Sequence, residues 1–276
     1  MNLIVGATSN LAVAIQDASL EKILTVSRKT YQTWSGKDGS ERIRKFFEER
    51  DEKLSNVYVT TGITDPLLTK DVIQTINVDL PVQIAKVASQ FGIRTYTFGT
   101  VAETFAGSPN VYVASKIALS NEILKNGNFD GFARHIRLHT LFGGKNLKRH
   151  MFLGQIITSI LHNKEFNMSS GNQIREYHHI DDVAKIILRL NHSDILENTH
   201  ISHGKPLRLI DLATRIFHEY GDIKNLRIGK VPIRDAENFD FRFSPYPLEA
   251  GFSIRCSIEE VEKYVEVCIK HGREVK

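Results

Sequence analysis

Two side chains that could transfer a proton, Tyr112 and Lys116, lie four residues apart in the segment Tyr-Val-Ala-Ser-Lys. In a helix this spacing puts both side chains on one face. The phenol of an isolated tyrosine has a pKa of about 10, and a nearby ammonium group favours the phenolate and lowers that pKa. The pair therefore indicates acid–base catalysis in which Tyr112 exchanges a proton and Lys116 assists it.

The same spacing occurs again at Tyr220 and Lys224, so spacing alone does not identify a site. The sequence around the two pairs differs. Tyr112 comes after a strand-like run that ends at Thr100 and a short loop, whereas Tyr220 ends a helical pattern outside the predicted sheet. We therefore predict that Tyr112 and Lys116 are catalytic and that the second pair is a coincidence.

A turn that could bind phosphate follows the first apolar run, residues 3–5, and opens a helical pattern. Unpaired N–H groups and the positive end of the helix dipole make such a turn suitable for a dinucleotide. Its three usual glycines correspond here to Gly6, Ser9 and Ala12, so a strand–turn–helix with a polar cap would show the same pattern. The cofactor-binding residues predicted in this turn are Gly6, Thr8, Ser9, Asn10 and Leu11.

The end of the second predicted strand distinguishes between the two dinucleotides. An acidic residue there binds the ribose 2′-hydroxyl of NAD, whereas an arginine suits the 2′-phosphate of NADP. This chain has Ser27, Arg28 and Lys29 at that place and no carboxylate. The sequence therefore predicts NADP(H), bound through Ser27 and Arg28, with a solvated polar loop as the alternative.

Short apolar runs alternate with helical patterns through the first half of the chain, which is typical of a parallel sheet. We predict an α/β fold: a Rossmann-like doubly wound parallel sheet with a smaller mixed C-terminal region that binds substrate. The predicted domains are residues 1–145, with 175–200 returning to them, and residues 146–174 with 201–276. The predicted strands are residues 3–5, 23–26, 57–60, 95–98 and 133–138, and the predicted helices are residues 11–15, 72–91, 112–124, 152–161, 182–190 and 209–220.

Several segments in order along the chain resemble the extended short-chain dehydrogenase/reductase family, whose members mostly act on nucleotide-activated sugars. These segments are residues 56–62, 77–78, 97–100, 112–116, 137–144 and 171–182. The resemblance implies that Thr60, Thr61 and Gly62 lie beside the cofactor and that Thr100 hydrogen-bonds the reacting oxygen. It also implies substrate contacts from Arg175, which grips a diphosphate in relatives, and from Thr140, which replaces the family's asparagine.

The resemblance implies a reductase that uses NADPH to reduce a keto group of a nucleotide-activated sugar, in particular a 4-keto-6-deoxy sugar. Family dehydratases have an Asp-Glu pair directly after the catalytic threonine, whereas this chain has Val101 and Ala102, and we interpret Glu103 as a loop carboxylate. The alternatives are a nucleotide-sugar epimerase and a non-catalytic NADP-binding regulator. The resemblance also implies a homodimer formed through the helices at residues 72–91 and 112–124.

Composition excludes several other classes of protein. The 276 residues carry a net charge of +4, and the basic segment at residues 145–150 lacks interleaved aromatic residues, so we expect no nucleic-acid partner. No apolar run is long enough to cross a bilayer and no leader pattern is present, so we expect no membrane partner. Cys256 and Cys268 fit no metal motif and suit a reducing cytoplasmic setting. His178 and His179 beside two aspartates lack a third ligand at a typical spacing, and we predict no metal.

Overall fold

A computed structural model of the chain describes residues 1–50, 52–65, 67–190, 199–247, 252–255 and 258–274. The chain divides into two compact units. Unit 1 comprises Met1–Thr104, Ser108–Leu138 and Ala184–Ile201, and unit 2 comprises Phe105–Gly107, His139–Val183 and Ser202–Lys276. These bounds differ from the predicted domains, because residues 139–145 and 175–183 fall in unit 2, where two short strands from these segments pair with each other. Which unit holds cofactor and which holds substrate stays a prediction.

Unit 1 is built on a six-stranded sheet in the order β10-β5-β4-β3-β1-β2, and every neighbouring pair is parallel. Its strands are β1 (Asn2–Val5), β2 (Ile23–Val26), β3 (Asn56–Val59), β4 (Arg94–Thr100), β5 (Ala133–Leu138) and β10 (Thr199–His200). All four residues of both β1 and β3 are buried, as expected of central strands that are covered on both faces. The predicted Rossmann-like doubly wound fold is confirmed.

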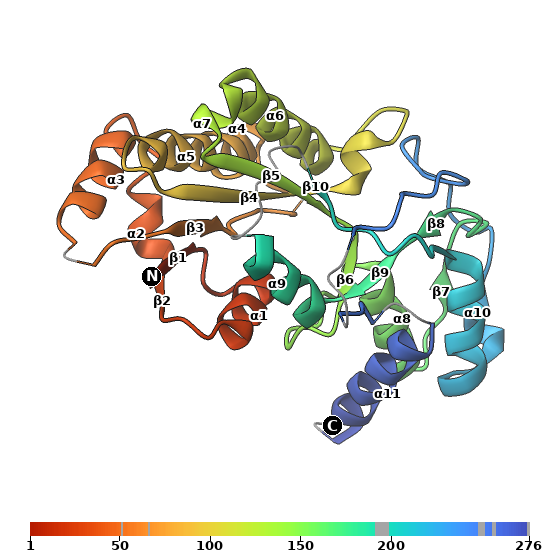
Figure 1. The fold of residues 1–276 in the computed structure, drawn as a ribbon. Coiled ribbons are helices and arrows are strands. Elements are labelled where there is room, and N and C mark those ends of the chain that lie inside the picture. The colour runs from red at the N-terminus through yellow and green to blue at the C-terminus, as the bar shows by residue number, and fades with distance from the viewer. Residues whose placement is uncertain (51, 66, 191–198, 248–251, 256–257, 275–276) are drawn as a thin grey trace. The chain divides into compact units, whose positions relative to one another are not determined.

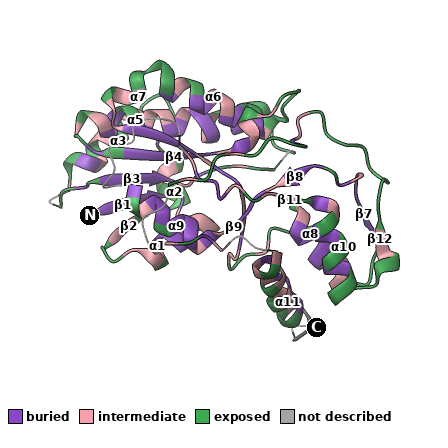
Figure 2. Cartoon of the chain, turned by 45° about the vertical axis from the view of Figure 1, so that its right-hand side comes forward, coloured by how far each residue is buried: buried purple, intermediate pink, exposed green. Residues whose placement is uncertain are grey.

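Helices cover both faces of this sheet: α5 and α6 lie over one face and α1 over the other (Figure 1). Figure 2 shows the strands between them as buried, while the outer sides of the helices are exposed. The helices of unit 1 are α1 (Asn10–Ala18), α2 (Arg28–Gln32), α3 (Gly39–Glu48), α4 (Lys70–Gln74), α5 (Leu80–Gln90), α6 (Val111–Lys125) and α7 (Gly127–Asp130). Helix α9 (Ile180–Arg189) begins in unit 2 and ends in unit 1.

Two features of these helices depart from the pattern in the sequence. The predicted helix over residues 72–91 is divided by a π-helical turn, Thr75–Asp79, directly before α5. Pro81, near the start of α5, has no N–H with which to bond the carbonyl four residues back, which favours such a break. The sequence also gave no sign of α3, whose buried residues Ile43 and Phe47 are separated by charged residues.

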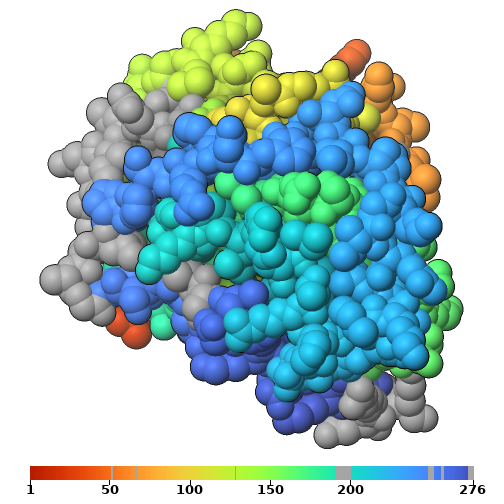
Figure 3. Space-filling model, turned by 90° about the vertical axis from the view of Figure 1, so that its right-hand side faces the viewer, coloured from red at the N-terminus to blue at the C-terminus, as the bar shows by residue number. Residues whose placement is uncertain are grey.

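In the described part of unit 2, three whole α-helices pack around a core of their own: α8 (Phe152–Leu161), α10 (Leu209–Tyr220) and α11 (Ile258–Glu274). Its strands pair in twos, β6 (Thr140–Phe142) with β9 (Tyr177–His179), β7 (Phe166–Asn167) with β12 (Leu226–Arg227), and β8 (Ile174–Arg175) with β11 (Leu207–Arg208). The predicted helices at 152–161 and 209–220 have the expected bounds, whereas α11 was missed. Figure 3 shows residues that follow β12, within 228–247 and in lighter blue, at the surface of the molecule.

None of the described helices is long and apolar enough to cross a membrane. Cys268 is a half-buried free thiol, and Cys256 lies outside the described residues. The predicted cytoplasmic location and the absence of nucleic-acid and membrane partners stay predictions.

Candidate functional site

The turn after β1 has the conformation that a dinucleotide-binding loop needs. Gly6 has a φ of +98°, and a Cβ there would lie 2.8 Å from the backbone nitrogen of Thr61. Only glycine fits such a place without strain. Ser9 accepts a hydrogen bond from the N–H of Ala12 and caps α1. Thr8 is exposed, and Asn10 and Leu11 begin α1. The serine in the second glycine place therefore serves as the helix cap.

The segment after β3 lies against this turn. The hydroxyl of Thr60 lies 3.0 Å from the carbonyl oxygens of both Val5 and Gly6 and donates to them. Thr61 is buried, and its hydroxyl oxygen has no hydrogen-bond partner among the described residues. A Cβ on Gly62 would lie 3.7 Å from the Nζ of Lys116. A glycine turn, an unpartnered buried hydroxyl and a buried amine thus meet at the carboxyl ends of β1 and β3, where a doubly wound sheet binds a dinucleotide.

The residues predicted to select NADP follow β2 directly. Ser27 caps the five-residue helix α2, because its hydroxyl accepts from the N–H of Thr30 at 3.4 Å. Arg28, the first residue of α2, is exposed. Neither residue is a carboxylate, so the acidic side chain that binds the ribose 2′-hydroxyl in NAD-binding domains is not present at these two positions. The preference for NADP stays a prediction.

Helix α6 carries both residues of the catalytic pair. Its N-cap is Asn110, whose side chain accepts from the N–H of Val113 at 2.9 Å. Lys116 is 4% exposed, Tyr112 is half-buried, and the Lys116 Nζ lies 5.9 Å from the centre of the Tyr112 ring. The four-residue spacing therefore does bring the two side chains together, as predicted.

The second pair with this spacing is arranged differently. Helix α10 ends at Tyr220, and Lys224 lies beyond it in a 3₁₀ turn, Ile223–Asn225. The rule that places residues four apart on one helical face does not apply across a helix end. Lys224 is exposed. Tyr220 and Lys224 thus do not share a helix, and Lys224 is not buried as Lys116 is.

A network that the sequence did not indicate holds α6 against the loop after β3. Asn77, in the π-helical turn, is fully buried and bonds both the N–H and the carbonyl of Ile63, at 2.8 and 3.0 Å. Its side-chain amide also donates to the hydroxyl of Ser115 at 2.9 Å, and that hydroxyl donates to the carbonyl of Tyr112 at 2.7 Å. Asn77 therefore ties the proposed cofactor segment to the helix that bears the catalytic pair.

The predicted effect of Lys116 on the phenol is wrong for this structure. Burial raises the pKa of Tyr112 to about 12, and the negative charge of Glu103 adds to the rise. Burial also lowers the pKa of Lys116 to about 8, against the opposing effect of Glu103. Desolvation thus outweighs the attraction expected from the spacing. A phenol that keeps its proton suits a proton donor to a ketone.

Thr100 ends β4, and its hydroxyl accepts from the N–H of Ala102 at 3.3 Å, so its hydrogen can be donated to a substrate oxygen. Glu103 is not the loop carboxylate that we expected. Its side chain is 1% exposed, forms a hydrogen bond with His135 and makes an ion pair with Arg137. No motif pointed to this contact, because Glu103 lies in the turn after β4 whereas His135 and Arg137 lie on β5.

A sequence model of the NAD-dependent epimerase/dehydratase family matches residues 3–202. The chain belongs to this family. The match confirms the resemblance to the extended short-chain dehydrogenases/reductases, and it contains β1 from its second residue, the whole of β2 to β5 and helix α6. No curated protein sequence is detectably similar to the chain.

Solved structures of family members share the fold at low sequence identity. The dTDP-glucose 4,6-dehydratase DesIV of Streptomyces venezuelae has a TM-score of 0.75 at 16% identity, covering 100% of this chain and 98% of that one. The UDP-glucose 4-epimerase of Thermus thermophilus, with NAD, has a TM-score of 0.74 at 13% identity, covering 100% and 99%. The dTDP-4-dehydrorhamnose reductase of Bacillus anthracis, with NADP, has a TM-score of 0.69 at 17% identity, covering 96% and 97%.

Of the predicted substrate residues, Thr140 and Arg175 lie in unit 2, whereas Thr100 lies in unit 1. Arg175 ends β8 and forms an ion pair with Glu237, while its guanidinium lies over the ring of Phe105 at 5.3 Å. Burial lowers its pKa, and the nearby charge of Arg234 acts in the same direction. Thr140 begins β6, and its N–H donates to the carbonyl of Glu176 at 3.1 Å. A diphosphate would therefore have to share or replace Glu237 on the Arg175 guanidinium.

A buried polar cluster in unit 2 is centred on the carboxylate of Glu176. It accepts from the hydroxyl of Ser202 and the N–H of His203, each at 2.9 Å, and from the ring of His178 at 3.0 Å. Burial alone would raise the pKa of Glu176, but His178, His139 and His203 outweigh it and hold that pKa at about 2. The carboxylate is therefore ionised and held by donors on several sides.

Part of this cluster has the composition of a metal site. The ligand atoms of His139, Glu176 and His178 lie within 4.8 Å of one another. The two imidazole rings are stacked, with centres 4.9 Å apart and planes 6° from parallel. Because a metal ion must lie near the plane of each imidazole, one ion cannot satisfy both stacked rings. We interpret the cluster as a hydrogen-bonded network, and the prediction of no metal stays a prediction.

We expect Glu176→Gln to lower the free energy of unfolding by about 1–3 kcal/mol at neutral pH, because buried donors lose a charged partner. A carboxyl whose folded pKa is about 2 instead of 4.5 contributes stability above pH 4.5 that is lost as pH falls toward 2. Urea unfolding between these pH values should therefore show a steeper acid loss in the wild type than in the variant. Glu219→Gln, at an exposed position of α10, is the matched control. If the free energy of unfolding changed with pH in the same way in the wild type and in Glu176→Gln, Glu176 would not be the ionised, stabilising carboxylate that we infer.

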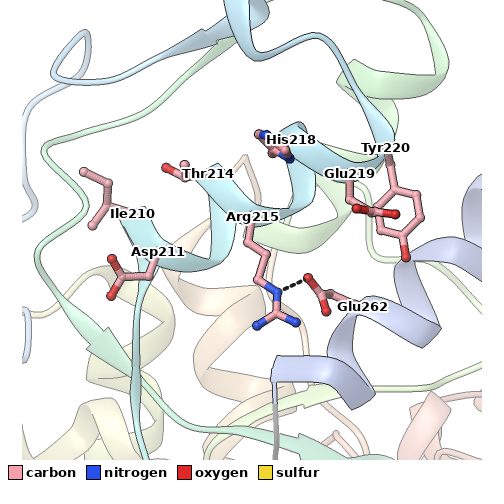
Figure 4. A pocket seen from close by; sticks show the side chains of 8 residues that line it. All are labelled: Ile210, Asp211, Thr214, Arg215, His218, Glu219, Tyr220 and Glu262. Atoms are coloured by element: carbon pink, nitrogen blue, oxygen red, sulfur yellow. Dashed lines mark ion pairs between the residues drawn. The ribbon is translucent and has the colours of Figure 1, made fainter.

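A surface pocket of unit 2 lies between α10 and α11 (Figure 4). Its floor carries an ion pair between Arg215 and Glu262, 2.5 Å apart, and Tyr220 lies at one end. None of the predicted site residues lines it. We assign it no part in the chemistry.

Proposed function

We propose that the protein is an NADPH-dependent reductase of a keto group on a nucleotide-activated sugar, with 4-keto-6-deoxy sugars as the first candidates. The observation that carries the proposal is the catalytic pair on α6. Tyr112 keeps its proton, Lys116 is buried beside Gly62, and α6 packs against β4, which ends at Thr100. The named activities of the similar dehydratase, epimerase and reductase support a nucleotide-sugar substrate.

The residues of this chain then have definite parts in the reaction. NADPH, when bound, supplies a hydride to the carbonyl carbon. Tyr112 donates its phenolic proton to the carbonyl oxygen, which Thr100 hydrogen-bonds, so that the ketone becomes a secondary alcohol. The Lys116 ammonium binds the nicotinamide ribose and balances the phenolate that Tyr112 leaves. Arg175 binds the diphosphate of the substrate.

Dehydration is disfavoured by the surroundings of Glu103. In this chain the residues directly after Thr100 are apolar, and the nearest carboxylate along the turn is already bonded to His135 and Arg137. A carboxylate held in this way is a poor base for removing a proton from a sugar carbon.

The proposal is tested by incubating the protein with NADPH and a panel of nucleotide 4-keto-6-deoxy sugars. Loss of NADPH absorbance with one member supports it, and no loss with any member contradicts it. A changed sugar without consumption of NADPH would instead identify an epimerase. Cofactor binding without turnover of any sugar would identify a regulator.

The choice of cofactor is tested by Arg28→Ser. We expect the preference for NADPH over NADH, measured as the ratio of dissociation constants, to fall by about tenfold or more, because a charge-assisted bond to the 2′-phosphate is lost. Arg42→Ser, at an exposed position of α3 in the same unit, should leave the ratio unchanged. Equal ratios in wild type and Arg28→Ser would exclude Arg28 as the selecting residue.

The predicted homodimer is part of the proposal. Three large apolar residues on the two helical segments that the family uses are exposed: Val72 by 42%, Val111 by 39% and Leu124 by 48%. A contact between two copies would cover such residues.

A further inference from the structure

Glu103 is a buried carboxylate that the proposed reaction does not yet use. It lies in the 3₁₀ turn Val101–Thr104, directly after β4. One of its oxygens accepts the backbone N–H of Thr100 at 2.6 Å. The carboxylate is therefore bonded to the residue whose hydroxyl is proposed to orient the reacting oxygen.

Two side chains from the neighbouring strand hold this carboxylate. The Nε2 of His135 lies 3.1 Å from it and the Nε of Arg137 lies 2.9 Å from it. Burial lowers the pKa of His135, so its imidazole is neutral and donates Nε2–H. Burial alone would raise the pKa of Glu103, but its bonds to His135, Thr100 and Arg137 outweigh it and lower that pKa. Glu103 is thus ionised at neutral pH.

Gly99 makes room for this arrangement. A Cβ at Gly99 would lie 1.9 Å from an oxygen of Glu103 and 2.2 Å from the Nε2 of His135. No real side chain could occupy that space while the two groups keep their places. The glycine before Thr100 therefore leaves the space that the Glu103 carboxylate occupies at the end of β4.

The charge of Glu103 reaches both members of the catalytic pair. It acts to raise the pKa of Lys116, against the lowering by burial to about 8, and it adds to the raised pKa of Tyr112. Without this charge, the Lys116 amine would lose its proton closer to neutral pH. A neutral amine could neither balance a phenolate nor bind ribose hydroxyls as strongly.

We propose that Glu103, held in place by His135 and Arg137, is a positioning residue for the Tyr112–Lys116 pair: it fixes the backbone of Thr100 and supplies the buried negative charge that acts on the pair. The part that concerns Thr100 rests on the proposed reductase function. The effect of Glu103 on Lys116 requires only that Lys116 binds the dinucleotide, and it does not depend on which sugar is reduced.

The test is the pH dependence of dinucleotide affinity, measured by NADPH and NADH fluorescence with no sugar present. In the wild type, affinity should weaken as pH rises through about 8, where Lys116 loses its proton. In Glu103→Gln the weakening should begin roughly half a pH unit or more lower, because a nearby negative charge is gone. Glu103→Asp keeps the charge, and its curve should stay with that of the wild type. Glu122→Gln, which removes a carboxylate from α6, should also leave the curve in place.

Glu103→Gln leaves the charge of Arg137 without its partner, so the double variant Glu103→Gln with Arg137→Gln is measured as well. It removes both charges of the ion pair, and its curve should move in the same direction. A purely structural role would weaken affinity equally at every pH and leave the midpoint in place, and an unmoved midpoint in the folded variants would overturn the proposal. Because no sugar is present, failure of the reductase assay would leave this result standing, and the reverse also holds.

Discussion

Tyr112→Phe is expected to lower kcat for ketone reduction by about 10² to 10⁴-fold, the usual contribution of a well-placed general acid. The substitution removes one oxygen from a half-buried ring and leaves Lys116 and its contact with Gly62 in place. Dinucleotide affinity should therefore change by less than about threefold, which corresponds to less than one neutral hydrogen bond. Stopped-flow measurement of NADPH oxidation with the best substrate of the panel, beside a fluorescence titration of NADPH, separates the two effects.

Tyr220→Phe is the matched control for this prediction. Tyr220 has the same spacing to a lysine, but it ends α10 and its partner Lys224 is exposed beyond the helix. The control should reduce the ketone at the wild-type rate. Substantial reduction by Tyr112→Phe, or an equal loss in Tyr220→Phe, would show that the phenol of Tyr112 is not the proton donor.

Gly6→Ala is expected to weaken dinucleotide binding by more than about tenfold and to lower the free energy of unfolding by about 1–3 kcal/mol. Two features of Gly6 cause these losses: its positive φ and the lack of space for a Cβ. Gly6 has a φ of +98°, and its new Cβ would lie 2.8 Å from the nitrogen of Thr61 and 3.0 Å from the carbonyl carbon of Thr60. The turn and the segment after β3 cannot both keep their places around the added methyl group. Fluorescence titration with NADPH and urea unfolding measure the two losses.

Gly36→Ala, in the same unit, serves as the comparison. A Cβ there would meet nothing within 4 Å, so we expect affinity to stay at the wild-type value and stability to change by less than about 1 kcal/mol. If Gly6→Ala bound NADPH as tightly as Gly36→Ala does, the turn after β1 would not be the place where the dinucleotide binds.

Local patterns were sufficient to predict the sheet of unit 1 and its main helices. The apolar runs that became β1 to β5 and the pattern that became α6 lie in continuous stretches, and the spacing of Tyr112 and Lys116 survives because one helix carries both. Helices in which charged residues outnumber apolar ones were missed. The buried residues Ile43 and Phe47 of α3 lie among charged ones, and in α11 two glutamates follow Ile258 and charged residues separate the apolar positions.

Contacts between distant segments could not be predicted. The bonds of Glu103 to His135 and Arg137 span more than thirty residues, and they depend on the register of β4 with β5, which places Gly99 beside Arg137. The bond of Asn77 to Ser115 spans a similar distance and depends on a π-helical turn. Neither register nor a helical irregularity is visible in the order of residue types.

The effect of burial on the pKa values of the site could not be predicted from the sequence either. From spacing alone, Lys116 should lower the pKa of Tyr112, whereas burial of the phenol and the charge of Glu103 raise it to about 12. The sequence by itself thus determined the family and the parallel sheet, and it is the source of the predicted reacting pair, because these depend on neighbours along the chain. Only the tertiary structure decided the protonation of that pair and the group that holds it, because desolvation and charge act through space.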